Sequence, residues 1–221
     1  GDLSWGIAAV NLRREQANQF MDHASADHGY LLKTTTPSGE SSFREVRSHV
    51  RFADWSNDAD EAESLLSQDS VKIVSMTVTE SGYYLNDDLS LNADHPIIRA
   101  EINGGKSVSI YAFLANALRQ RMLTINAPIS VLCCDNIRSN GDVLGQNFKE
   151  YLKLTGETPL EKWVEVNTTF PNSMVDRITP RATDVLQTEI SSISPKHSAT
   201  AIHGESYIQW VLKYNFASDF P

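Results

Sequence analysis

The chain has 221 residues, of which 41% are hydrophobic and 21% are charged, and its formal net charge is −9. This composition is typical of a folded globular protein and excludes an intrinsically disordered one. Basic residues do not cluster, so we expect no nucleic-acid partner. No apolar run approaches the roughly 18 residues that a membrane-crossing helix needs, so we expect no membrane partner either.

The first third of the chain alternates strand and helix patterns. An apolar run over residues 5–11 predicts a buried parallel strand, and helical spacing of apolar side chains predicts a helix over 14–26. Two segments rich in β-formers, 30–35 and 43–52, flank the turn-forming stretch 36–40, which predicts a hairpin. The sequence therefore begins as an α/β protein.

The rest of the chain repeats this alternation. Apolar, β-branched stretches predict further strands at 71–79, 129–132 and 167–170. Helical periodicity or capping residues predict helices from 58, over 107–122, after 141, over 158–164 and over 184–192. Residues 85–105 have the Asn, Asp and Gly content of a loop, and order resumes over 203–211. Strands that alternate with helices imply parallel βαβ units.

The two cysteines, Cys133 and Cys134, are adjacent on one predicted strand. Successive strand residues point to opposite faces, so these thiols are poorly placed to pair with each other. Buried, reduced side chains and a cytoplasmic setting fit this usage, because disulfide frameworks belong to small secreted chains.

Polar side chains follow three of the predicted strands. They are Thr79-Glu80, Asp135-Asn136 and Asp176-Arg177. Each pair has a plain structural alternative: a solvated turn, a turn-forming asparagine, and an aspartate that pairs with the adjacent arginine. Because ligands of open α/β sheets bind outside the carboxyl ends of the strands, the three pairs together predict one wall of an active site.

Several well-known motifs are absent from the sequence. There is no G-x-G-x-x-G, no P-loop, no H-E-x-x-H, no C-x-x-C and no G-x-S-x-G. The six histidines are scattered, and His23 and His28 are too far apart to share a helix face. We therefore expect no metal site.

Four stretches, in order, carry a family resemblance. They are Thr77-Val-Thr-Glu-Ser-Gly-Tyr83, Cys134-Asp-Asn136 with Asn140-Gly141, Phe170-Pro-Asn-Ser-Met-Val-Asp-Arg-Ile-Thr-Pro180 and Glu205-Ser-Tyr-Ile-Gln-Trp-Val211. In these stretches the chain resembles the polyol-specific long-chain dehydrogenases, the mannitol dehydrogenase family. The branch that acts on D-arabinitol is the most similar; mannitol 2-dehydrogenases and fructuronate (mannonate) reductases are the alternatives.

The resemblance implies an α/β fold with a Rossmann-type, mostly parallel sheet flanked by helices over residues 1–200. Residues 201–221 would start an α-helical substrate domain. The family's first strand and glycine motif find no match before Trp5, and its catalytic lysine motif finds none up to Pro221. We therefore expect an incomplete dehydrogenase that is inactive in isolation or acts only through association. Loss of the first, mid-sheet strand should leave its neighbours with unpaired edges.

The activity implied by the resemblance is metal-independent hydride transfer between NAD and a sugar alcohol or ketose, D-arabinitol to D-xylulose, in a monomer or weak oligomer. In this family a lysine of the helical domain is the general base and two asparagines hold the developing alkoxide. The resemblance gives one of these asparagine roles to Asn136, at the edge that borders the cofactor. It matches Asp176 to a carboxylate near that lysine.

The remaining candidates are binding residues. The resemblance places Thr77, Thr79 and Glu80 at the strand end that borders the cofactor. Asn172 and Arg177 lie in the third matching stretch and are candidates for contacts with the substrate.

Asn11 is the last candidate, and it bears on the choice of cofactor. It ends the strand whose tip usually carries an acidic residue on the ribose 2′-hydroxyl. Arginines follow at 13 and 14 and could take a 2′-phosphate, so NADP stays open beside NAD.

Overall fold

A computed structural model describes residues 4–17, 20, 29–195 and 200–218. The chain forms two compact units, each described by itself below. Unit 1 is Gly1–Ala62 with Asp176–Gln209 and Pro221, and unit 2 is Glu63–Val175 with Trp210–Phe220. The predicted helix over 14–26 lies mostly outside the described residues, which show the 3-10 turn η1 (Arg14–Gln16) at its start.

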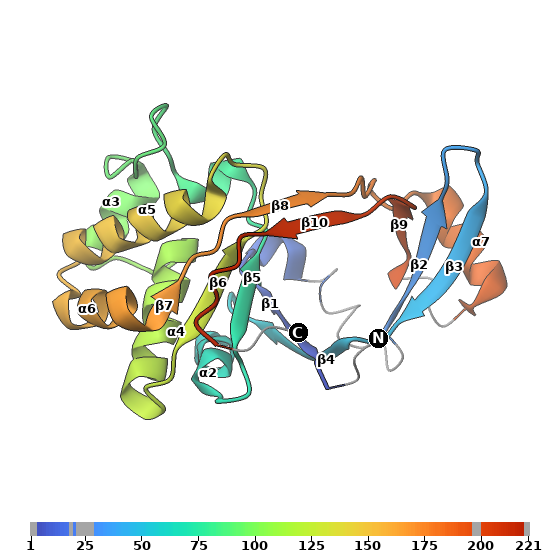
Figure 1. The fold of residues 1–221 in the computed structure, drawn as a ribbon. Coiled ribbons are helices and arrows are strands. Elements are labelled where there is room, and N and C mark those ends of the chain that lie inside the picture. Colours follow the sequence, from blue (N-terminus) through green and yellow to red (C-terminus); the bar gives the residue numbers. More distant parts are fainter. Residues whose placement is uncertain (1–3, 18–19, 21–28, 196–199, 219–221) are drawn as a thin grey trace. The chain divides into compact units, whose positions relative to one another are not determined.

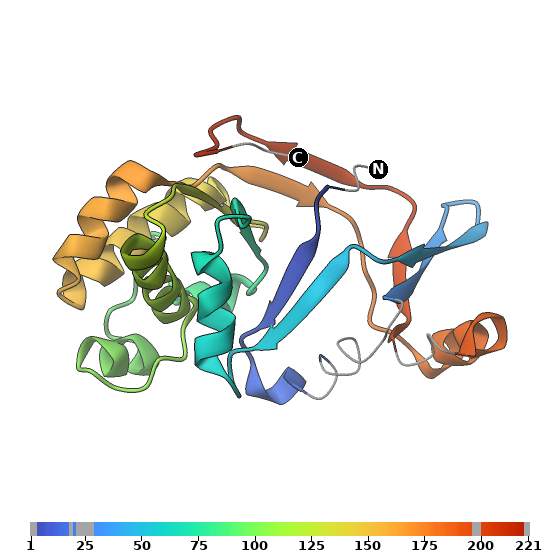
Figure 2. The ribbon, with the colours of Figure 1, turned by 90° about the horizontal axis from the view of Figure 1, so that it is seen from below.

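Unit 1 contains two small sheets. In the first, β1 (Ile7–Asn11) pairs in parallel with β4 (His49–Asp54), and Figure 2 shows the two strands side by side. In the second, β2 (Tyr30–Thr35) lies between β3 (Ser41–Val46) and β9 (Ile202–Glu205). The β2–β3 pair is antiparallel, which confirms the hairpin.

The predicted single strand over 43–52 was wrong. It is divided between β3 and β4, which belong to different sheets. The backbone of β4 bonds to β1 instead of continuing along the hairpin, and Phe52 is the register partner of Ala9. Strand propensity reports how well side chains suit a pleated surface and carries no information on which partner the backbone takes.

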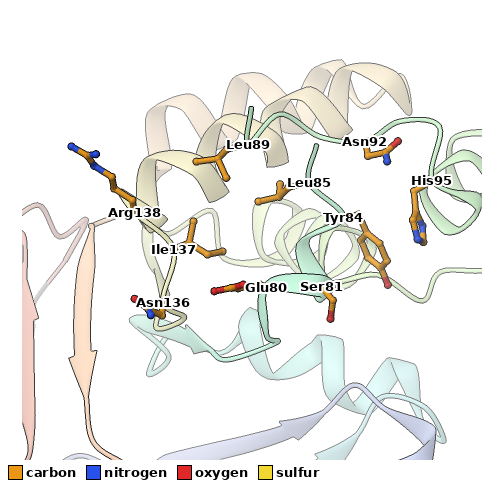
Figure 3. A pocket seen from close by; sticks show the side chains of 10 residues that line it. All are labelled: Glu80, Ser81, Tyr84, Leu85, Leu89, Asn92, His95, Asn136, Ile137 and Arg138. Atoms are coloured by element: carbon orange, nitrogen blue, oxygen red, sulfur yellow. The ribbon is translucent and has the colours of Figure 1, made fainter. Parts of the chain in front are cut away.

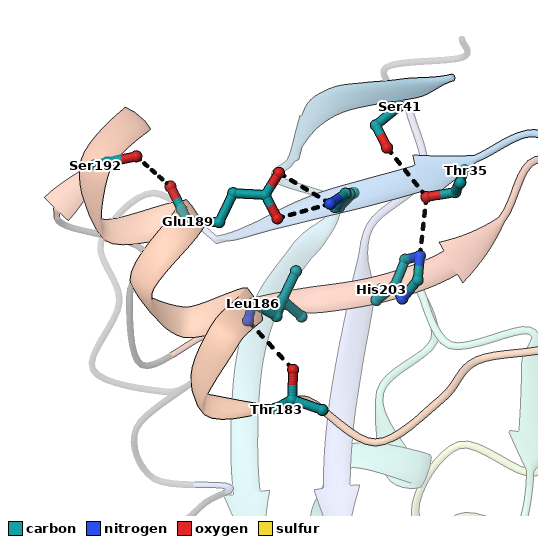
Figure 4. Close-up of polar contacts among 8 residues, drawn as sticks. Thr35, Ser41, Thr183, Leu186, Glu189, Ser192 and His203 are labelled. Atoms are coloured by element: carbon teal, nitrogen blue, oxygen red, sulfur yellow. Dashed lines mark hydrogen bonds and ion pairs between the residues drawn. The ribbon is translucent and has the colours of Figure 1, made fainter. Parts of the chain in front are cut away.

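Helix α7 (Asp184–Ile193) packs on the second sheet of unit 1 and confirms the helix predicted over 184–192. Leu186 and Ile190 of the helix share an apolar cluster with Leu31 of β2. Lys33 reaches across from β2 to the Glu189 carboxylate at 2.6 Å, and the Thr183 hydroxyl accepts a hydrogen bond from the Leu186 N–H at the start of the helix (Figure 4).

Unit 2 is the larger α/β layer. Its parallel sheet has the order β5 (Ile73–Met76), β6 (Ile129–Cys133), β7 (Thr168–Thr169). Helices α4 (Ile110–Thr124), α5 (Asn140–Leu154) and α6 (Thr158–Asn167) lie beside it (Figure 1). Every residue of β6 is buried. These strands and helices confirm the sequence predictions, although β5 and β7 are shorter than predicted and β6 is one residue longer.

A buried arginine side chain holds the C-terminal end of α4 in place. The guanidinium of Arg121 is fully buried and donates to the carbonyl oxygens of Leu66, Gln68, Ala127 and Pro128 at 2.6–3.2 Å. Leu66 belongs to the 3-10 turn η2 (Leu65–Ser67), which continues α2 (Ala59–Ser64), and Pro128 precedes β6. One side chain therefore ties three segments of the unit together.

Some elements were not predicted from the sequence. Helix α3 (Pro96–Ile102) lies in the stretch expected to be a loop, with the His95 ring accepting a hydrogen bond from the Ile97 N–H at 3.3 Å.

Strands β8 (Ser173–Asp176) and β10 (Gln209–Leu212) pair with each other. Strands β9 and β10 thus occupy the stretch expected to begin a helical domain, and the boundary at residue 200 stays a prediction. No helix in the described residues is long and apolar enough to span a membrane.

Two strands of these sheets have a single neighbour each. Among the described residues, β1 pairs only with β4 and β5 pairs only with β6. In the part of the chain that the structure describes, each of these two strands therefore has one edge without a strand partner in its own sheet.

Candidate active site

A cavity of about 500 Å³ opens at the carboxyl ends of β5 and β6, within unit 2. Its walls come from the 3-10 turn η3 (Glu80–Tyr83), from the loop before α3 and from the loop after β6. Lining it are Glu80, Ser81, Tyr84, Leu85, Leu89, Asn92, His95, Asn136, Ile137 and Arg138. This is where the sequence predicted a site, because two neighbouring parallel strands end there in polar residues.

The lining side chains divide into an apolar group and a polar rim. Leu85, Leu89 and Ile137 point toward one another in the middle of the cavity (Figure 3). At one end the Glu80 side chain extends toward Asn136. The cavity therefore offers apolar surface to a carbon skeleton and hydrogen-bonding groups around it.

The other end of the cavity holds an aromatic pair. The Tyr84 and His95 rings are tilted against each other with centroids 4.6 Å apart. Nδ1 of His95 accepts the Ile97 N–H, so in the neutral ring the proton sits on Nε2. Nε2 is therefore a hydrogen-bond donor, and its ring is held in place because His95 caps helix α3.

Asn136 is exposed at the cavity, and its amide makes no hydrogen bond within the described part of the chain. The turn that it belongs to is closed by the backbone, with the Ile137 N–H donating to the Asp135 carbonyl at 2.8 Å. A turn-forming asparagine uses its side chain on its own backbone. The Asn136 amide is instead available to a ligand.

Asp135 joins the ends of the two strands. Its Oδ2 accepts the Val78 N–H at 2.9 Å and the Tyr83 hydroxyl at 2.6 Å, and its Oδ1 accepts the Thr79 N–H at 3.2 Å. Burial, with the Cys133 thiol and the Asp135 carboxylate nearby, raises the pKa of Tyr83 far above its ordinary value. Tyr83 therefore stays a neutral hydroxyl that donates to the carboxylate.

Asn140, at the start of α5, fixes the same strand end from behind. Its amide nitrogen lies within hydrogen-bond distance of the Cys133, Asp135 and Ser173 carbonyl oxygens, at 2.8–3.1 Å. Its Oδ1 accepts the Gly141 and Ser173 N–H groups. A Cβ on Gly141 would lie 2.4 Å from the Phe170 carbonyl oxygen, so the close approach of these backbones requires glycine there.

The structure places three predicted binding residues at the end of β5 and one elsewhere in unit 2. Thr77, Thr79 and Glu80 are exposed there, and Glu80 lines the cavity with Asn136. Asn172 does not line it: its amide pairs with the Asp142 N–H and carboxylate at 3.0 and 2.8 Å, in the first turn of α5. Its predicted role toward substrate stays a prediction.

The remaining candidates belong to unit 1. Asp176 ends β8 and is exposed, and Arg177 lies against Gly204. The Asn11 amide donates to the Asp54 carboxylate at 3.0 Å and to the Arg13 carbonyl at 2.9 Å. None of the three lines the cavity. Their roles stay predictions.

Sequence reasoning missed the residues that hold the site together. Asp135 and Asn140 both stood in the matching stretch without a role of their own, and His95 lay in a presumed loop. The stretch Cys134-Asp-Asn136 with Asn140 did carry a signal, because polar residues directly after a fully buried strand must find partners there. In the described ranges no three His, Cys, Asp or Glu side chains are grouped to hold a metal ion.

The parallel sheet, its flanking helices and the cavity at the strand ends define a Rossmann-type α/β domain. Residues 2–220 match the family model for the mannitol dehydrogenase Rossmann domain, so the chain belongs to the mannitol dehydrogenase family. Two similar curated relatives are D-arabinitol 4-dehydrogenases, from Klebsiella pneumoniae (36% identical) and Ralstonia nicotianae (35% identical). A polyol:NADP oxidoreductase from Gluconobacter oxydans is 31% identical.

These alignments use nearly all of this chain and under half of each relative. The chain covers 48% of the Klebsiella protein, 46% of the Ralstonia protein and 45% of the Gluconobacter protein. Among solved structures, a D-sorbitol dehydrogenase in substrate-free form matches with a TM-score of 0.88 and 31% identity over 99% of this chain and 46% of that one. The Pseudomonas fluorescens mannitol 2-dehydrogenase ternary complex with NAD and D-mannitol matches with a TM-score of 0.89 and 27% identity, over 98% and 44%.

Proposed function

We propose that this chain forms the cofactor-side domain of an NAD-dependent sugar-alcohol dehydrogenase that converts D-arabinitol to D-xylulose. The observation that carries the proposal is the unpaired, exposed amide of Asn136, in one cavity with Glu80 at the ends of two parallel strands. The two D-arabinitol 4-dehydrogenases among the similar relatives support the substrate.

The residues present suit a dinucleotide at these strand ends. The apolar group of Leu85, Leu89 and Ile137 suits the flat face of a ring, and the polar rim suits the hydroxyl and amide groups of a nicotinamide nucleotide or a polyol. NAD, when bound, supplies the acceptor for the hydride. The protein's part on this side is to bind, to orient and to stabilise charge.

Asn136 has the clearest role in this proposal. Its amide N–H donates a hydrogen bond to the substrate oxygen as negative charge develops there. An amide does not titrate, so this stabilisation is independent of pH. Glu80, Thr77 and Thr79 border the cofactor, and Asp176 tunes the lysine base that the family resemblance implies.

The proposal favours NAD over NADP. The Asn11 amide is already engaged by Asp54, whose carboxylate stands at the end of the neighbouring strand β4. A negative charge at this edge disfavours a 2′-phosphate. Arg14 follows three residues after Asn11 and is exposed, so an arginine is available to a 2′-phosphate. NAD and NADP should therefore be compared directly, with the protein at the length its gene encodes.

The experiment that tests the proposal is steady-state kinetics on that protein. Asn136→Ala should lower kcat and kcat/KM together by about 10²-fold, the scale for losing one oxyanion donor. Asn86→Ala is the matched control, because Asn86 is an exposed asparagine whose amide bonds to Ser90 outside the cavity. Unchanged turnover in Asn136→Ala would refute the role of Asn136.

Substrate choice is tested separately. D-arabinitol, D-mannitol and D-mannonate are compared in one assay with NAD and then with NADP. We expect the highest kcat/KM with D-arabinitol and NAD. A clear preference for mannonate would overturn the substrate assignment and leave the family assignment intact.

A further inference from the structure

We propose that Asp135 is a positioning residue that holds the end of β5 in the one backbone conformation that presents Glu80 and Asn136 to the same cavity. This inference rests on the proposed function. It concerns a side chain that itself lies outside the lining of the cavity.

The hydrogen bonds of Asp135 bracket Glu80. The donors are the backbone N–H groups of Val78 and Thr79, just before Glu80, and the Tyr83 hydroxyl, just after it. Asp135 is also the residue next to Asn136. One carboxylate therefore fixes both ends of the turn that carries Glu80 while standing beside the residue that carries the amide.

The backbone that Asp135 holds is strained. Thr79 has φ 68° and ψ 158°, outside the regions that a β-branched residue adopts readily. Such a conformation persists only where its surroundings impose it, and strain of this kind gathers at functional sites. The Asp135 oxygens accept the N–H of Thr79 and of the residue before it, so the carboxylate is placed to impose this conformation.

The chemistry of the contact requires a carboxylate. All three partners are donors, and an ionised carboxylate only accepts. An asparagine has nearly the same shape, but its NH₂ group would face a donor on one side. Asp135→Asn therefore removes the fixing interaction without opening a cavity.

The first test is a kinetic cycle on the protein at the length its gene encodes. We expect Asp135→Asn to lower kcat/KM by about 10-fold or more in the wild-type background, and by less than about 3-fold when Asn136 is already alanine. Positioning predicts this loss of additivity, whereas a purely structural role predicts equal factors in both backgrounds. Equal factors, or unchanged kcat/KM in folded Asp135→Asn, would overturn the inference.

Tyr83→Phe provides a milder variant, since it removes one of the three donors and leaves the carboxylate in place. Its matched control is Tyr151→Phe, because Tyr151 is also a buried tyrosine with a carboxylate, that of Glu101, close to its hydroxyl. We expect Tyr83→Phe to lower kcat/KM several-fold and Tyr151→Phe to lower only stability. Equal kinetic effects of the two variants would count against Asp135.

A second measurement does not need activity. Hydrogen exchange of the Val78 and Thr79 amides should accelerate at least 10-fold in Asp135→Asn, while amides of the buried strand β6 keep their protection. If the wild-type protein turns over none of the three substrates, the proposed function fails, and this exchange still decides whether Asp135 holds the turn. Unchanged exchange at both amides would contradict the inference.

Discussion

Asn140→Ala is the sharpest test of how the strand end is built. The substitution removes an amide that reaches the end of β6, the first turn of α5 and the start of β8. Asn147→Ala is its matched control on the same helix. Both asparagines are 2% exposed, but within the described residues the Asn147 amide makes one hydrogen bond, to the Leu89 carbonyl at 2.9 Å.

The expected difference follows from the hydrogen bonds. The Asn140 amide has two N–H groups to donate, and its oxygen accepts two backbone N–H groups, which makes four bonds at about 1 kcal/mol each. Their loss should lower the free energy of unfolding by about 4 kcal/mol. Asn147→Ala loses one such bond, about 1 kcal/mol, beside a similar loss of packing.

Urea denaturation followed by tryptophan fluorescence measures both values, with the slope of the transition checked for constancy. We expect Asn140→Ala to be the less stable variant by about 3 kcal/mol. Equal free energies of unfolding for the two variants would refute the reasoning, because burial and residue type are the same and only the number of hydrogen bonds differs.

Two further predictions concern the buried Arg121 and the half-buried Cys134. Arg121→Lys keeps the charge but replaces the five donors of a guanidinium with the three of an ammonium. We therefore expect it to lower the free energy of unfolding by about 2 kcal/mol in the same assay. An unchanged value would contradict the stabilising role of the Arg121 hydrogen bonds. Burial raises the pKa of Cys134 to about 11 from an ordinary 9.0, so the unfolded state releases this proton first and stability should fall as the pH rises from about 9 to 11. Cys134→Ser should reduce that slope, and an identical slope in both proteins would count against the assignment.

The sequence predicted the elements whose pattern is long and local. Residues 107–122 repeat apolar side chains at helical spacing, and residues 129–133 are apolar except for Ser130. Each pattern reflects burial on one face or on all sides. The short helix α3 has only seven residues in polar surroundings, and its stability comes from the His95 cap and the buried Ile98. Neither the cap nor the single buried isoleucine distinguishes this stretch from the polar sequence on either side of it.

Strand partners were less predictable, for a different reason. The segment 43–52 has uniform β propensity, yet its two halves take partners in different sheets: β3 pairs with β2 and β4 pairs with β1. Backbone hydrogen bonds do not depend on side-chain identity. The same holds for Asp135, whose donors are two backbone N–H groups 56 and 57 residues away.

The asparagines of the chain show what the structure adds to the sequence. Asn11, Asn140 and Asn172 each stand at or next to a strand or helix end, as Asn136 does. For Asn136 the sequence allowed both a turn-forming and a catalytic role. In the structure the amides of the first three are engaged by the protein, with Asp54, with three carbonyl groups and with Asp142 respectively. Only the fourth is left exposed at a cavity, and its turn is already closed by backbone bonds. A protein that satisfies its other tip asparagines and leaves this one to a ligand favours catalysis over turn formation as the role of Asn136.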